Sequence, residues 1–252
     1  MEIPIMSPQL MVLVSAIVFG AATVKGVAGL GFPLIAVPLV ANIIGPHAAV
    51  VIIVVPTVAS NLFMVAQGGG TAVRLRQMGW LILGLVAGAA VGARMLRQIN
   101  PAFLSAVLGV VAVGYAGAEL VRLPLRLSAA PRPPLSLGVG AAAGLLGGST
   151  SIYAPLLAAY VDSLRLGKDE FVFWVTLLFL IGTSTQVITY LQVGIYRTGM
   201  LGVALWLCLP MLAGTWLGIR LRGRLSPVRF RTLVLVLVAL SGVNLIARSL
   251  WR

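Results

Sequence analysis

The chain has 252 residues and a formal net charge of +13, and 60% of its residues are apolar while 9% are charged. A soluble domain carries about 25% charged residues, so this composition excludes a soluble protein and predicts an integral membrane protein. One cysteine (Cys208), one histidine (His47) and five acidic residues also exclude a disulfide framework and a thiolate or multi-histidine metal site. We therefore expect no enzyme, no metal and no cofactor.

Apolar stretches separated by Gly, Pro and Arg predict membrane helices, because lipid offers no water to bond free backbone amides. Ten segments are expected, in chain order at about 8–24, 30–44, 46–67, 78–96, 101–121, 135–147, 149–162, 169–190, 199–219 and 230–250. A crossing helix needs roughly 20 residues. The segments at 135–147 and 149–162 are shorter than that. Whether the first pair of segments in each half crosses fully or turns back inside the membrane stays open.

The sequence of the first half recurs in the second half. Trp80–Gly88 resembles Trp206–Gly214, which begins 126 residues later, and Gly31–Leu39 resembles Gly148–Leu156, which begins 117 residues later. Self-similarity at this spacing predicts a duplicated architecture. We expect one integral membrane domain composed of a first repeat, a proline-rich linker and a second repeat, at residues 1–122, 123–134 and 135–252 respectively.

Each half contains five segments, and because five is an odd number, the two repeats should have opposite orientations in the membrane. With the N-terminus outside, twelve Lys and Arg residues fall in inside loops and five in outside loops. The positive-inside rule favours that arrangement. We therefore expect a bacterial inner-membrane protein with two inverted repeats and both termini in the periplasm. Basic residues at membrane boundaries, without a stripe of interleaved aromatics, also argue against nucleic acid as a partner.

Each half contains a glycine-rich break between its first two segments. The break reads Lys25–Pro33 in the first half and Gly147–Ser151 in the second. Glycine permits non-helical backbone, and Pro33 suits the first turn of a new helix. Interrupted segments at matching places of two inverted halves indicate the binding site of a carrier.

A helix that begins after such a break suits an anion, because its first N–H groups lack helical partners and carry a partial positive charge. Two such helix ends near the axis between the halves are expected to hold a small oxyanion. Ser149, Thr150 and Ser151 would add hydroxyl donors, and Lys25 would add a full charge. Alternatively, Lys25 extends its ammonium group to the cytoplasmic boundary of the membrane.

Polar residues in the third segment of each half, Asn61, Thr183 and Gln186, could complete the site or could only bond helices together. Tyr153 and Tyr190 could line the path, although aromatic residues in apolar segments more often pack. The candidate substrate-binding residues are Lys25, Gly29, Gly31, Phe32, Pro33, Asn61, Gly148, Ser149, Thr150, Ser151, Thr183 and Gln186.

Glycines at four-residue spacing occur at 84, 88 and 92 and again at 214 and 218. Such stripes predict close contacts between membrane helices and are compatible with a homodimer. His47, Glu119 and Asp162 are candidates for coupling transport to a proton, although each lies near the end of a segment, where a solvated boundary residue is the simpler interpretation.

Glycines that precede a proline-leucine pair form a pattern in both halves. They are Gly20, Gly26, Gly29 and Gly31 before Val37-Pro38-Leu39, and Gly140, Gly144, Gly147 and Gly148 before Ala154-Pro155-Leu156. This pattern resembles the sulfite exporter TauE/SafE family, also called the 4-toluene sulfonate uptake permease family, over essentially the whole chain. The more glycine-rich pattern of that family is replaced here at Phe32-Pro33 and Ser149–Ser151.

The resemblance implies a secondary transporter of small sulfur-containing anions, such as sulfite and aryl or alkyl sulfonates, that works by alternating access. Coupling to a proton or another cation is compatible with it. The alternatives are an anion channel or a permease for carboxylates or other anions with the same fold, a membrane-embedded enzyme, and an assembly factor. The scarcity of His, Cys and acidic residues disfavours the enzyme.

Overall fold

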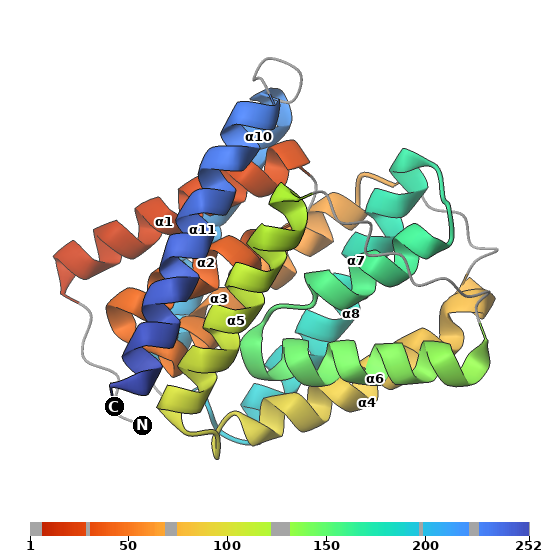
Figure 1. The fold of residues 1–252 in the computed structure, drawn as a ribbon, viewed down its shortest axis with the longest axis horizontal. Helices are drawn as coiled ribbons and strands as arrows, with labels where there is room; N and C mark the ends of the chain where they lie inside the picture. Colours follow the sequence, from red (N-terminus) through yellow and green to blue (C-terminus); the bar gives the residue numbers. More distant parts are fainter. Residues whose placement is uncertain are drawn as a thin grey trace. The chain divides into compact units, whose positions relative to one another are not determined.

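The computed structural model describes residues 7–28, 31–68, 75–121, 132–196, 199–221 and 227–251. Over these residues every regular element is an α-helix, which confirms the predicted all-α fold (Figure 1). In chain order the helices are α1 (Pro8–Ala28), α2 (Phe32–Ile44), α3 (Pro46–Val65), α4 (Leu75–Met95), α5 (Pro101–Leu120), α6 (Pro133–Thr150), α7 (Ala154–Ser163), α8 (Lys168–Gln192), α9 (Met200–Trp206), α10 (Cys208–Leu221) and α11 (Pro227–Leu250).

Six apolar stretches of the described chain are long enough to cross a membrane. They are Pro8–Val27, Pro46–Val65, Met78–Met95, Pro101–Leu120, Asp169–Gln192 and Met200–Leu221. Their length of 18 to 24 residues matches the roughly 30 Å thickness of the hydrocarbon core. The protein is therefore an integral membrane protein.

Local sequence explains where several helices begin and end. Asn100 precedes Pro101 at the start of α5, and its side-chain oxygen accepts a hydrogen bond of 2.8 Å from the backbone N–H of Ala102. The predicted segment 199–219 is interrupted at Leu207, so that α9 ends at Trp206 and α10 begins at Cys208. Pro210 accounts for this interruption, because a proline lacks the N–H that would bond four residues back and clashes with that carbonyl.

The break in the second half lies later than the sequence predicted. The sequence predicts a break at Gly147–Ser151, between segments 135–147 and 149–162, but α6 continues to Thr150 and α7 begins only at Ala154. Close packing keeps the last turn of α6 helical, since a methyl group at Gly148 would lie against the backbone of Ala89 in α4. With 10 residues, α7 is too short to cross a membrane, and so is α2 with 13.

The helices form two compact units. Unit 1 contains α1, α2, the part of α3 up to Pro56, α5, α9, α10 and α11, and unit 2 contains the rest of α3, α4, α6, α7 and α8. In unit 1, α1 packs on α10 and α2, while α11 packs on α5 and α2. In unit 2, α4 packs on α6 and α8, and α7 packs on both α6 and α8. Each unit therefore takes helices from both halves of the sequence.

The predicted glycine stripes lie at two of these helix pairs, as expected. In unit 2, a methyl group built on Gly84, Gly88 or Gly92 of α4 would meet the backbone of Leu137, Ala141 or Leu145 of α6 respectively. In unit 1, methyl groups on Gly214 and Gly218 of α10 would meet the backbone of Phe19 and Thr23 of α1 respectively. Both pairs thus bring backbone against backbone, which only glycine permits. The fourth segment of each half packs on the first segment of the other half, which is compatible with inverted repeats.

At the two breaks, the helix ends of the two halves are related by a different spacing from the sequence match. The α1 helix ends at Ala28 and α6 at Thr150, and α2 begins at Phe32 and α7 at Ala154, so both pairs are 122 residues apart. The sequence match of 117 residues had paired Pro38 with Pro155. In the structure Pro155 corresponds instead to Pro33, because both occupy the first turn of a helix, whereas Pro38 lies inside α2. Of the predicted linker 123–134, residues 123–131 lie outside the described residues, and α6 begins at Pro133.

Candidate substrate site

The break in unit 1 separates α1 from α2. The helix α2 begins at Phe32 after Gly31, whose φ of 101° lies in the left-handed region that favours glycine. The N–H of Ile35 donates to the carbonyl of Gly31 at 3.2 Å, which starts the helical ladder. Phe32 is buried and Pro33 lies in the first turn. The predicted site residue Gly29 lies outside the described residues.

Lys25 lies in the last turn of α1, three residues before the end of that helix. Its side chain is only 2% exposed. The side chain is therefore buried inside the protein. An ammonium group in an apolar interior is costly unless other groups compensate its charge.

The break in unit 2 separates α6 from α7. Ser151 has a φ of 61°, which is uncommon for a residue other than glycine, and its N–H donates to the carbonyl of Gly147 at 2.6 Å. The next helix begins at Ala154 with Pro155 in its first turn. Both helices therefore have a proline in the first turn, but the residue directly before the helix is left-handed only in α2, where it is Gly31, and not in α7, where it is Tyr153 with a φ of −97°.

Two of the three predicted hydroxyl donors at this break bond to their own helix. The Ser149 hydroxyl donates to the carbonyl of Leu145 at 2.9 Å, and the Thr150 hydroxyl donates to that of Leu146 at 2.6 Å. Thr150 also accepts a hydrogen bond of 3.1 Å from the N–H of Ile152. The hydroxyls of Ser149 and Thr150 therefore stabilise the last turn of α6 and the start of the break.

Gln186 of α8 lies at the centre of a buried network beside this break. Its side-chain nitrogen donates toward the hydroxyl of Tyr190 at 2.7 Å, the hydroxyl of Ser151 at 3.0 Å and the carbonyl of Gly148 at 3.1 Å. Its side-chain oxygen accepts a hydrogen bond of 3.2 Å from the hydroxyl of Tyr153. The structure thus brings three predicted site residues together: Gly148, Ser151 and Gln186.

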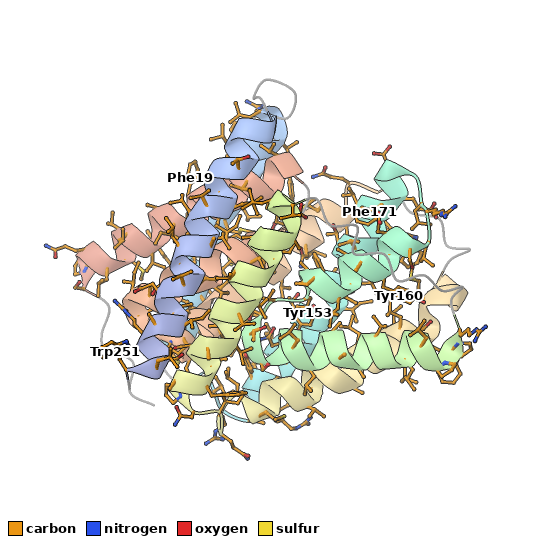
Figure 2. The ribbon with its side chains drawn as sticks, in the orientation of Figure 1. Phe19, Tyr153, Tyr160, Phe171 and Trp251 are labelled. Atoms are coloured by element: carbon orange, nitrogen blue, oxygen red, sulfur yellow. The ribbon has the colours of Figure 1, made fainter. Side chains whose placement is uncertain are left out.

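Tyr153 and Tyr190 belong to this network, although sequence reasoning favoured simple packing for both. The Tyr190 hydroxyl donates to the carbonyl of Gly148 at 3.2 Å, and the Tyr153 hydroxyl donates to that of Gly182 at 3.0 Å. Figure 2 labels Tyr153 at the connection between α6 and α7. The spacing of Gly182, Gln186 and Tyr190 at four-residue intervals was the available signal, because it places all three on one face of α8.

The other two polar candidates are buried within helices. Thr183 is fully buried, and its hydroxyl donates to the carbonyl of Phe179 at 2.7 Å in its own helix. Asn61 is fully buried in α3. The structure therefore leaves Thr183 outside the Gln186 network, since its hydroxyl bonds to the backbone of α8.

Comparison with known proteins identifies one family. Residues 14–245 match the model of the family TauE, described as sulfite exporter TauE/SafE. No curated protein and no solved structure matches the chain.

Proposed function

The chain belongs to the sulfite exporter TauE/SafE family, and on this premise we propose that it is a secondary transporter of small sulfur-containing anions that works by alternating access. The family consists of membrane transporters rather than enzymes, and its name indicates sulfur anions as the transported class. Sulfite and aryl or alkyl sulfonates are the proposed substrates. They share a compact, negatively charged SO₃ group with several acceptor oxygens.

The buried lysine Lys25 carries this proposal. It lies in the last turn before the break between α1 and α2, and its side chain is 2% exposed. A positive charge in surroundings of low dielectric constant attracts an anion far more strongly than it would in water. The helix start at Gly31 and Phe32 adds backbone N–H groups that have no partner within the helix.

We propose that the break of unit 1 binds the anion through Lys25 and the backbone N–H groups of Gly31 and Phe32, while Pro33, which has no N–H, fixes the first turn of α2 beside them. Gly29 belongs to the same proposed set, although it lies outside the described residues. In the second half we propose that Gly148–Ser151 and Thr183 contribute to the site, and Asn61 of α3 adds to it from the first half. Gln186 belongs to the proposed site as the residue that holds the second break. The network of hydrogen bonds described above supports a functional role for the break in unit 2.

The proposal extends to the membrane and to coupling. We propose that the protein lies in the bacterial inner membrane with both termini in the periplasm, because the distribution of Lys and Arg over the loops favours that orientation. A proton or another cation is the proposed coupling ion. A homodimer is also proposed, although the glycine stripes do not support it, because they pack α4 on α6 and α10 on α1 within the chain.

Ligand-induced thermal stabilisation tests the substrate class. Purified protein is heated with sulfite, sulfate, thiosulfate, alkyl and aryl sulfonates, or carboxylates. A ligand at 100 times its dissociation constant stabilises the folded state by about 2.7 kcal/mol, which raises the unfolding temperature by roughly 5–11 °C at about 2–4 °C per kcal/mol. The proposal predicts this rise for sulfite or a sulfonate. A rise with carboxylates alone would overturn the sulfur-anion assignment.

Flux measurements test the mechanism. Proteoliposomes that contain the purified protein should take up labelled sulfite with saturable kinetics, and unlabelled substrate inside the vesicles should accelerate uptake by exchange. Unitary conductance steps without such exchange would identify a channel of the same fold instead. Absence of stabilisation and of flux with every sulfur anion would refute the proposed transport function.

A further inference from the structure

The side-chain amide of Gln186 uses all of its hydrogen-bond donors within the protein. Its nitrogen carries two hydrogens, and three acceptors lie within 2.7–3.1 Å of it: the hydroxyls of Tyr190 and Ser151 and the carbonyl of Gly148. Gln186 itself is fully buried. An amide in these surroundings has no hydrogen left to donate to an anion, so a direct contact with the substrate does not explain its position.

The partners of Gln186 lie on the α6 side of the helix break. Gly148 is in the last turn of α6, where carbonyls have no partner within the helix. Its carbonyl accepts hydrogen bonds from both Gln186 and Tyr190, at 3.1 and 3.2 Å. Ser151, the residue with a φ of 61°, is bonded to the same amide. Gln186 thus donates a hydrogen bond to the Gly148 carbonyl, which has no partner within α6, and also bonds to Ser151, where the chain turns.

The α7 side of the break is bonded to Gln186 as well. Tyr153, the residue before α7, is 3% exposed, and its ring lies against Gly147 and Gly182, where a methyl group on either glycine would meet the ring. Its hydroxyl donates toward the carbonyl of Gly182 and the side-chain oxygen of Gln186, at 3.0 and 3.2 Å. One side chain of α8 therefore bonds to residues on both sides of the break.

The two breaks differ in their side chains. At the spacing of 122 residues that relates the helix ends at the breaks, Lys25 corresponds to Gly147. The cation therefore belongs to the break of the first half, and the neutral network belongs to the break of the second half.

We propose that Gln186 is a positioning residue. Together with Tyr190 it holds the end of α6 and the start of α7 in the geometry that the transport cycle requires, and it donates no hydrogen bond to the substrate. This inference rests on the proposed transport function. It assigns the second break a structural task and leaves recognition of the anion's charge to Lys25.

Hydrogen exchange in the substrate-free protein tests the inference, because a positioning residue acts before any substrate binds. The backbone amides of residues 149–157 are followed by mass spectrometry in wild-type protein and in Gln186→Met, which keeps the length of the side chain but removes its donors and acceptor. Exchange in this segment should accelerate about tenfold. Thr189→Val is the matched control, since the Thr189 hydroxyl is buried on the same helix but donates only to the carbonyl of Thr185, at 2.8 Å.

Tyr190→Phe provides a milder second variant, because it removes one hydroxyl and keeps the ring. The Gly148 carbonyl accepts hydrogen bonds from the Gln186 amide and from the Tyr190 hydroxyl. Each single variant removes one of these two donors, whereas the double variant removes both. The acceleration of exchange in the double variant should therefore exceed the product of the two single effects. If Gln186→Met proves unstable, Tyr190→Phe alone should still accelerate exchange in residues 149–157, by a smaller factor of about fivefold.

Transport assays separate the positioning role from a substrate contact. Gln186→Met should lower kcat for labelled sulfite in proteoliposomes about tenfold and should change KM by less than about threefold. Unchanged exchange at residues 149–157 in both variants, or a selective rise in KM, would overturn the inference. The proposed function fails separately, through absence of saturable sulfite flux in the wild-type protein, and the exchange result does not depend on that flux.

Discussion

Two glycines of the same helix should respond in opposite directions to the same substitution. A methyl group at Gly144 of α6 would lie 2.6 Å from the backbone nitrogen of Ala89 and 3.0 Å from the carbonyl carbon of Gly88, both in α4. These contacts are with backbone, which cannot rotate away as a side chain would. At Gly138, six residues earlier in α6, nothing lies within 4 Å of the added methyl group.

The magnitudes follow from two opposing effects. Replacing a helical glycine by alanine stabilises the helix by about 0.5–1 kcal/mol, because alanine has less backbone freedom to lose. Overpacking a close contact costs about 1–3 kcal/mol. Gly138→Ala should therefore stabilise the protein by about 0.5–1 kcal/mol. Gly144→Ala combines the same gain with the overpacking cost, so the two variants should differ by the whole of that cost, about 1–3 kcal/mol.

Thermal unfolding of the two purified variants in one detergent measures this difference. At about 2–4 °C per kcal/mol, the unfolding temperature of Gly144→Ala should lie roughly 2–12 °C below that of Gly138→Ala. Because both substitutions are on α6 and both replace glycine by alanine, helix propensity cancels in the comparison. Equal unfolding temperatures would refute the close backbone contact between α4 and α6.

Three further predictions concern unit 1 and the topology. Lys25→Met should weaken sulfite binding about 10- to 150-fold, the effect of losing about 1.5–3 kcal/mol of charge-assisted bonding. Lys25→Arg should retain most of the affinity. If thermal-shift titrations give the same sulfite affinity for the wild-type protein and both variants, Lys25 does not belong to the binding site. Asn42→Leu should destabilise the protein by about 2 kcal/mol, because the Asn42 side chain bonds to Ser241 at 2.8 Å and to Asn244 at 2.6 Å. Asn244→Leu, which removes only the second bond, should cost about 1 kcal/mol in the same denaturation assay. Alkaline phosphatase fused to the C-terminus should be active, since that enzyme folds only in the periplasm, and an inactive fusion with normal expression would contradict the orientation.

Local features of the sequence are sufficient for the broad architecture. A chain with 60% apolar and 9% charged residues can expose most of its surface only to lipid, and lipid imposes helices on the backbone. Helix starts are also readable locally, as at Asn100-Pro101. The glycine stripes predict close helix contacts for the same reason, because four-residue spacing places the glycines on one face whatever the partner helix is.

Tertiary contacts decide the positions of the break and its bonds. The glycines at 147 and 148 suggest non-helical backbone, but both are helical and the break lies at Ser151–Tyr153. Gly148 packs against the backbone of α4 and Gly147 against the ring of Tyr153. Likewise, the sequence offered Ser149 and Thr150 as donors to a substrate, whereas their hydroxyls bond to carbonyls of α6. Glycine is compatible with both a bend and a close contact, so sequence alone does not distinguish them.

The sequence by itself therefore determined that this protein is a helical membrane protein of a transporter family, with a cation beside one helix break. The tertiary structure alone decided that Gln186 bonds to Gly148, 38 residues away, and that Tyr153 lies between two glycines of different helices. The physical reason is the range of the interactions. Hydropathy and helix termini depend on neighbouring residues, whereas the partners of a buried amide depend on which distant helices pack around it.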